Sequence, residues 1–125
     1  MEKGGRMYDL TKYEDMADLL VIADALITDY SSSAMDFAIL GRRVFIYQED
    51  IADYTAHDRE LYYRMEDSPF LIAHDQEELS ALIASTGDDE ARINCRKIEE
   101  FFGFNETGHA GRSAAERIIS WLDAK

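Results

Sequence analysis

The chain has 125 residues, enough for one small domain or for part of a larger one. Its 26 acidic and 13 basic side chains give a net charge of −13, which argues against nonspecific binding to nucleic acid or to an anionic membrane surface. A hydrophobic content of 46% excludes a disordered chain, and no apolar run approaches the roughly 20 residues that span a bilayer. The single cysteine, Cys95, excludes an internal disulfide and suits a cytoplasmic location.

The first predicted elements follow a short start, Met1 to Arg6, whose composition is that of a flexible lead or a cloning remnant. The segment 7–10 is predicted to be extended, and Thr11 is the expected N-cap of the helix that follows. Apolar side chains at helical spacing predict that helix over 13–23.

A strand, a polar loop and a second helix are predicted next. The apolar run over 25–28 predicts a short buried strand, and the helix after it extends to Leu40. Ser33-Ala34-Met35-Asp36 fits the Ser-x-x-acid capping box, with Gly41 as the C-terminal stop. The run over 44–47 (Val-Phe-Ile-Tyr) is typical of a central parallel strand.

The second half of the chain is predicted to be mostly helical. An acidic and aromatic connection over 48–68 ends at Pro69, and the segment 70–73 is predicted to be a strand. Apolar spacing then predicts helices over 76–84, 88–102 and 112–123.

Strands that alternate with helices predict an α/β fold, with an incomplete Rossmann-like parallel sheet flanked by helices. The four strand candidates are 7–10, 25–28, 44–47 and 70–73. Because no glycine-rich βαβ pair precedes them, the chain reads as the second half of a nucleotide-binding domain.

The polar loop Asp29 to Ser33 follows a predicted strand directly, and ligands of such folds bind at the carboxyl ends of strands. Hydroxyl groups and the free N–H groups of a first helical turn attract anions. The loop is therefore a candidate phosphate-binding site.

This region closely resembles the signature of the CDP-glycerol glycerophosphotransferases, which build teichoic-acid-type polymers on a GT-B glycosyltransferase fold. The matching residues are Asp24-x-Leu26-Ile27-Thr28-Asp29-Tyr30-Ser31-Ser32-x-x-x-Asp36-Phe37-Ala38-x-Leu40-Gly41-Arg42. Further likeness lies in Tyr54, in Asp58-Arg59-x-Leu61-Tyr62-Tyr63, in Ser68-Pro69-Phe70 and in the last helices. The resemblance covers nearly all of the chain after Met7, and it implies that 7–125 is the C-terminal part of a GT-B donor-binding domain.

The resemblance implies a role for five residues. Ser31 and Ser32 would hold the pyrophosphate of CDP-glycerol, and Asp36 would accept hydrogen bonds from the ribose hydroxyls. Arg59 would contact a donor phosphate, and Asp29 would brace the loop by accepting backbone N–H groups. The arrangement demands no metal and no cofactor.

Two residues depart from the family pattern, and one part of the family is missing. Glu60 stands where glycine is usual, which weakens the assignment of its neighbour Arg59, and Arg43 stands where proline is usual. No residues correspond to the acceptor domain, which would bind a polyprenyl-linked acceptor, or to the catalytic histidines. We therefore assign no catalytic residue and expect the chain alone to be inactive, with a parent enzyme peripheral at the inner face of the membrane.

Simpler interpretations of the same residues remain open. The serines could only cap a helix, Asp36 could only complete the capping box, and Arg59 could form a surface pair with its acidic neighbours. The chain could also come from another GT-B nucleotide-sugar transferase, or be a receiver-like interaction module with Asp29 as phosphoacceptor. An exposed sheet edge or the C-terminal helix offers a surface for self-association.

Overall fold

The computed structural model describes residues 6–49, 65–104 and 106–124. Three parallel strands form one sheet in the order β1, β2, β3, with β1 at Ala25–Thr28, β2 at Arg43–Tyr47 and β3 at Leu71–Ala73. The helices are α1 (Met16–Ile22), α2 (Ser33–Ala38), α4 (Gln76–Ser85), α5 (Asp88–Phe102) and α6 (Ala110–Asp123), and a 3₁₀ turn, η1, spans Met65–Asp67. The α/β class and the parallel sheet flanked by helices are thereby confirmed.

Strand β2 is the centre of the sheet, as its uninterrupted apolar sequence predicted. Val44, Phe45 and Ile46 are each at most 2% exposed, because β2 has a strand on either side and helices over both faces. Ile27 of β1 and Leu71 of β3 are both in register with Phe45.

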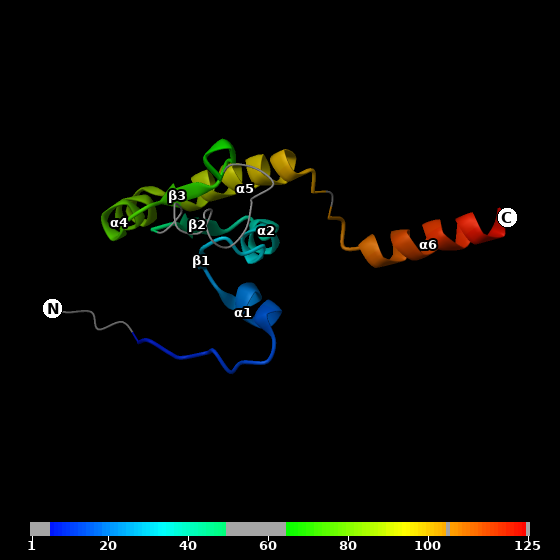
Figure 1. Ribbon diagram of the computed structural model, residues 1–125, viewed down its shortest axis with the longest axis horizontal. Helices are drawn as coiled ribbons and strands as arrows, with labels where there is room; N and C mark the ends of the chain where they lie inside the picture. The colour runs from blue at the N-terminus through cyan, green and yellow to red at the C-terminus, as the bar shows by residue number, and fades with distance from the viewer. Residues whose placement is uncertain (1–5, 50–64, 105, 125) are drawn as a thin grey trace.

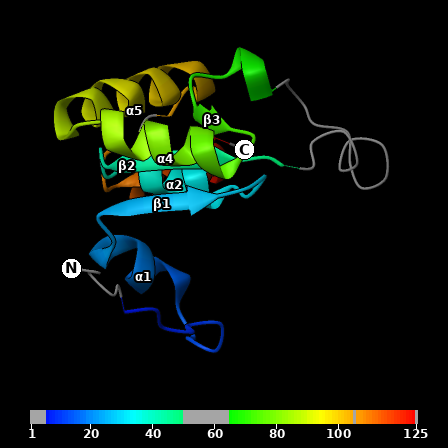
Figure 2. The same ribbon diagram turned by 90° about the vertical axis from the view of Figure 1, so that its left-hand side faces the viewer.

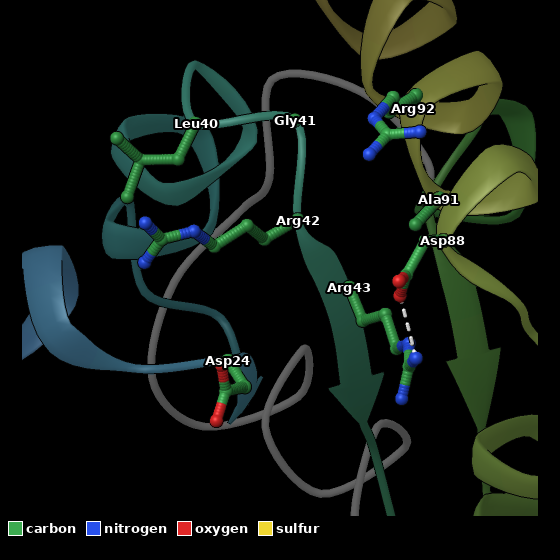
Figure 3. Close-up of a pocket in the computed structure, with 8 residues that line it drawn as sticks. All are labelled: Asp24, Leu40, Gly41, Arg42, Arg43, Asp88, Ala91 and Arg92. Carbon is green, nitrogen blue, oxygen red and sulfur yellow. Dashed lines mark hydrogen bonds and ion pairs between the residues drawn. The ribbon is translucent and has the colours of Figure 1, made fainter.

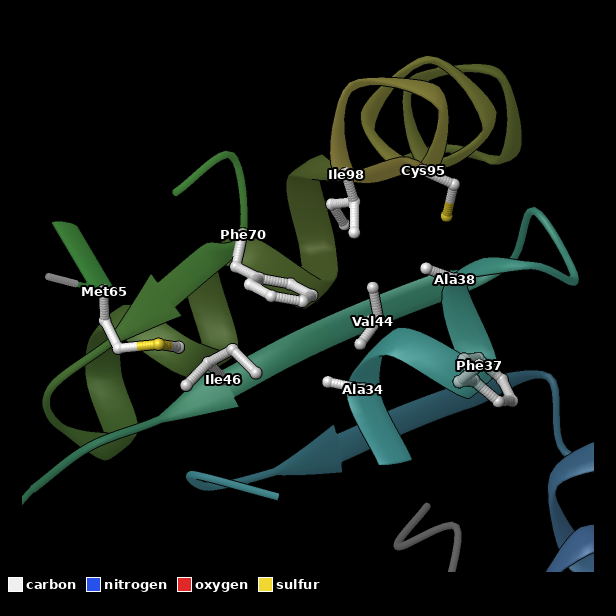
Figure 4. Close-up of a cluster of buried hydrophobic side chains, with 9 residues drawn as sticks. All are labelled: Ala34, Phe37, Ala38, Val44, Ile46, Met65, Phe70, Cys95 and Ile98. Atoms are coloured by element: carbon white, nitrogen blue, oxygen red, sulfur yellow. The ribbon is translucent and has the colours of Figure 1, made fainter. Parts of the chain in front are cut away.

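The helices lie on both sides of this sheet (Figure 2). Helix α2 lies behind the strands in that view and α4 lies in front of them. Figure 4 shows the core between the sheet, α2 and α5, in which Val44 and Ile46 face apolar side chains of both helices. The buried members of this core are Ala34, Phe37, Ala38, Val44, Ile46, Met65, Phe70, Cys95 and Ile98.

The N-terminal segment differs from the prediction in two ways. Residues 7–10 form no strand, and Met7 and Tyr8 are exposed, so the described sheet has three strands instead of the four counted from sequence. An extended segment becomes a strand only by pairing its backbone groups with a neighbour, which apolar composition does not guarantee. Thr11 is not the N-cap of α1 either, because its amide and hydroxyl both donate to Asp9. The cap is Asp15, which accepts the N–H of Ala17 at 2.8 Å.

Helix α1 has no buried residue, and one arginine fastens it to the sheet. The Nη1 atom of Arg42, just before β2, donates to the carbonyl oxygens of Val21 and Ala23 at 2.6 and 2.7 Å. These carbonyls lie at the C-terminal end of α1, where helical carbonyls lack intrahelical partners.

Helix α6 stands apart from the rest of the molecule (Figure 1), and each of its residues is exposed. Its apolar side chains Ile118, Ile119 and Leu122 are 58–60% exposed. The helix that the apolar spacing predicted is therefore present, but its apolar stripe packs into no core among the described residues.

Candidate functional site

The candidate site is the loop that joins β1 to α2 at the carboxyl edge of the sheet. The loop is held by its own serines, because the hydroxyl of Ser31 accepts the N–H of Ser33 at 3.3 Å and lies 2.9 Å from the Ser33 hydroxyl. The carbonyl of Ser31 accepts the N–H of Ala34 at 3.3 Å. A hydroxyl thus fills the backbone-bracing role that was predicted for Asp29, which accepts no hydrogen bond within residues 6–49.

The predicted capping box is wrong. The N-cap of α2 is Ser32 instead of Ser33, it has helical φ and ψ angles of −62° and −14°, and its side chain makes no capping hydrogen bond. A side chain reaches the N2 or N3 amide only from the extended conformation that most N-caps adopt, which explains the missing bond. Ser32 is exposed, and its hydroxyl has no partner among the described residues. Helix capping therefore does not explain why a serine stands at this position.

Asp36 lies in the first turn of α2 and is exposed. It has no capping role, and its carboxylate makes no hydrogen bond or ion pair with the described part of the chain. Its two oxygens remain available to accept hydrogen bonds from a ligand. Because α2 is only six residues long, its dipole adds little, and the serine hydroxyls are the main donors of the loop.

Arg59, the fifth predicted site residue, and its neighbour Glu60 lie outside the described residues. The other departure from the family pattern, Arg43, is the first residue of β2 and forms an ion pair of 2.6 Å with Asp88 of α5. An arginine in place of proline therefore links the start of β2 to the start of α5.

A second polar group at the carboxyl edge was missed in the sequence. Gln48 follows β2 directly and is 1% exposed, and neither of its side-chain amide atoms has a hydrogen-bond partner among the described residues. Its carbonyl oxygen lies 3.3 Å from Nδ1 of His74, which follows β3. The signal in the sequence was available, because a glutamine ends an apolar run at the edge where ligands of this fold bind.

A cavity of about 500 Å³ lies at the opposite, amino edge of the sheet (Figure 3). Its lining includes Arg42, Arg43 and Asp88, which already have partners in the two helix carbonyls and in the Arg43–Asp88 pair. Arg92, also in the lining, pairs with Asp89 at 2.8 Å. The Arg42 hydrogen bonds link α1 to the start of β2 and the Arg43–Asp88 pair links α5 to it, whereas the Arg92–Asp89 pair lies within α5, so we assign this edge a structural role.

No group of three or more histidine, cysteine or carboxylate side chains that could hold a metal ion occurs in the ranges 6–49, 65–104 and 106–124. In the same ranges, no helix has the length and apolar character needed to cross a membrane.

Comparison with known proteins gives a consistent family. The sequence profile described as "CDP-Glycerol:Poly(glycerophosphate) glycerophosphotransferase" matches residues 1–120. A teichoic acid glycerol-phosphate transferase of Staphylococcus aureus is 49% identical over 43 residues, which are 34% of this chain and 11% of that protein. A teichoic acid poly(ribitol-phosphate) polymerase of Bacillus spizizenii is 28% identical over 115 residues, or 92% of this chain and 18% of that protein.

Solved structures of the wall teichoic acid polymerase TagF are similar in fold. One has a TM-score of 0.66 at 30% identity, and the match covers 93% of this chain and 29% of the other. Another, a variant soaked with CDPG, has a TM-score of 0.66 over 94% of this chain and 30% of the other. The chain thus spans less than a third of the proteins it matches.

Proposed function

Because the chain belongs to the CDP-glycerol:poly(glycerophosphate) glycerophosphotransferase family, we propose that it is the donor-binding portion of such an enzyme. The observation that carries the proposal is the loop after β1, where Ser32 and Asp36 are exposed, make no side-chain capping hydrogen bond and follow a parallel strand in a GT-B-like sheet. The CDPG soak of the similar TagF structure supports a cytidine diphosphate donor.

Four of the five predicted residues contact the donor in this proposal. Ser31 and Ser32 bind the pyrophosphate with hydroxyl and backbone donors, and Asp36 accepts from the two ribose hydroxyls. Asp29 lies at the base of the loop, and Arg59 supplies positive charge to a phosphate in a strongly acidic chain.

The parent reaction is a phosphoryl transfer. A hydroxyl of the acceptor, which is a polyprenyl-linked primer or the growing polymer, attacks the β-phosphate of CDP-glycerol, and CMP leaves. The loop donors stabilise negative charge as it grows on the leaving group. We propose that the acceptor and the catalytic base bind to or come from parts of the enzyme beyond this chain, which alone gives no turnover, and that the enzyme acts in the cytoplasm at the inner face of the membrane.

An NMR titration of the ¹⁵N-labelled chain tests this proposal. CDP-glycerol is added, with CDP, UDP-glucose and inorganic pyrophosphate as comparisons and a Ser32→Ala variant as control. We expect shifts centred on Ser31 to Asp36 with the two cytidine compounds, and weaker shifts in the variant. Equal shifts with every phosphate would instead indicate a general anion site, and UDP-glucose preferred over CDP would favour a nucleotide-sugar transferase.

The polyol of the donor needs its own comparison, because one relative is a poly(ribitol-phosphate) polymerase that matches 92% of the chain. CDP-ribitol is therefore titrated beside CDP-glycerol. Tighter binding of the ribitol compound would keep the site and the reaction class, and would change the polymer assigned to the parent enzyme.

A further inference from the structure

The Gln48 side chain is a buried polar group without a partner at the edge where the donor is proposed to bind. Its backbone is satisfied, since its N–H donates to the carbonyl of Ala73 at 2.9 Å and its carbonyl lies 3.3 Å from Nδ1 of His74. The side-chain amide is not satisfied, because Nε2 and Oε1 are both buried and neither has a partner in the described ranges 6–49, 65–104 and 106–124. Buried polar groups in folded proteins nearly always have hydrogen-bond partners, so this exception indicates a partner that is not part of the described chain.

The position of Gln48 brings it next to the serine loop. Side chains alternate along a strand, so Gln48 continues the row of Val44 and Ile46, which face α2 in the core. Strand β1 ends at the carboxyl edge and β2 begins at the amino edge, so α2 runs back between them and its first residue, Ser33, lies at the carboxyl edge. The register pairs Thr28 with Ile46, which places the loop after β1 beside Gln48.

We propose that the Gln48 side-chain amide binds the polyol end of the nucleotide donor, an inference that rests on the proposed function. The amide offers two N–H donors at Nε2 and an acceptor at Oε1. A phosphate only accepts, so it would satisfy Nε2 and leave Oε1 buried and unpaired. Each polyol hydroxyl both donates and accepts, so adjacent hydroxyls satisfy both atoms of the amide.

Direct observation of the amide protons tests the proposal on the unmodified chain. Four side chains carry an amide NH₂ group, those of Gln48, Gln76, Asn94 and Asn105, so the NH₂ signals that disappear in a Gln48→Met variant are assigned to Gln48. We expect CDP-glycerol to shift the Gln48 NH₂ signals and the Ser31–Ser33 amides, and CDP to shift the Ser31–Ser33 amides alone. A Gln48 signal that moves equally with CDP would overturn the polyol assignment, because CDP has the base, ribose and phosphates but no polyol.

The two proposals fail in different ways. Shifts of the Ser31–Ser33 amides by CDP-glycerol with an unmoved Gln48 signal would overturn the role of Gln48 and keep the donor site. If no cytidine compound moved the serine amides, the proposed function would fail, and the role of Gln48 would fail with it.

Replacement of Gln48 separates ligand binding from a structural role. Gln48→Met removes the unpaired amide at similar volume, so we expect a higher Tm for the free chain, together with a loss of CDP-glycerol affinity of about 2- to 10-fold and unchanged CDP affinity. The matched control is Gln76→Met at the exposed start of α4, for which neither affinity should change. A lower Tm in Gln48→Met with unchanged CDP-glycerol affinity would show that the amide serves the fold instead.

Discussion

Ser31 and Ser32 are neighbours of the same residue type, yet their hydroxyls do different things. The Ser31 hydroxyl accepts the N–H of Ser33, whereas the Ser32 hydroxyl has no partner among the described residues. Mutation of each serine therefore separates the contribution of Ser31 to the fold of the loop from the donor contact that we propose for both serines.

We expect Ser32→Ala to leave the free energy of unfolding within about 0.5 kcal/mol of the parent value, since no hydrogen bond is lost. Ser31→Ala should lower it by about 0.5–1.5 kcal/mol, because the Ser33 N–H loses its acceptor. Urea denaturation measures both values. A larger loss for Ser32→Ala than for Ser31→Ala would mean that Ser32 is the structural residue.

Cys95 is 2% exposed, and its Sγ donates to the carbonyl of Arg42 at 3.1 Å. Burial, with a smaller contribution from Glu99, raises the pKa of the thiol to about 11. The unfolded chain loses the thiol proton at lower pH than the folded chain does. The protonated Cys95 thiol therefore adds its full contribution to the free energy of unfolding below the pKa of the unfolded chain. This contribution is lost as the pH rises through the pKa of the folded chain.

We predict that titration of this thiol lowers the free energy of unfolding by about 2 kcal/mol between pH 9 and pH 11. Urea denaturation of the parent and of Cys95→Ala across this range measures the difference, because other titrating groups, such as Tyr47, are common to both chains. Parallel pH profiles for the two proteins would contradict the prediction.

At the scale of elements, three of the four predicted strands are present within one residue of their predicted bounds, because β-prone runs such as 44–47 are short and sharply bounded, whereas the predicted strand 7–10 is absent. The caps were predicted less well, since the choice between Thr11 and Asp15, or between Ser33 and Ser32, depends on backbone angles that side-chain type does not fix. The position of Gln48 at the end of an apolar run was visible in the sequence, but the burial of its amide without a partner among the described residues is visible only in the folded chain.

The turn from α2 to β2 depends on a glycine, Gly41. Its φ of +65° lies in the left-handed region, and an added Cβ would meet only Arg92 Cγ at 3.8 Å, so backbone strain is the main penalty. We expect Gly41→Ala to lower the unfolding free energy by about 1–2 kcal/mol. Gly111, within α6 and without a positive φ, is the control, and Gly111→Ala should cause no loss. Equal effects in urea denaturation would contradict this expectation.

Arg42 links the end of α1 to the sheet. Leu20 of α1 packs against the core, and the two hydrogen bonds from Arg42 add a polar link between the end of α1 and the start of β2. We predict that Arg42→Met speeds amide hydrogen exchange at least about fivefold in α1, with little change in β2. Unchanged exchange in α1 would show that other contacts hold it. Arg96→Met, at an exposed position of α5, is the control.

At the scale of the whole molecule, the exposed apolar stripe of α6 contrasts with the buried core around β2. We propose that α6 pairs with a second copy when this chain is alone, with the net charge of −13 opposing the contact. Analytical ultracentrifugation should show a weight-average mass that rises with salt, and Ile118→Lys should lower it. A monomer at every salt concentration would overturn self-association through this helix.

The topology of the sheet also has a consequence for the order of folding. The first pairing joins Ala25 to Arg43 around α2, whereas the second joins Phe45 to Leu71 and closes a longer loop. The shorter closure costs less chain entropy, so β1, α2 and β2 are expected to assemble in the folding nucleus before β3 joins them. The serine loop lies inside that unit. Mutations in the serine loop that change stability should therefore alter the folding rate, while mutations in β3 should alter mainly the unfolding rate.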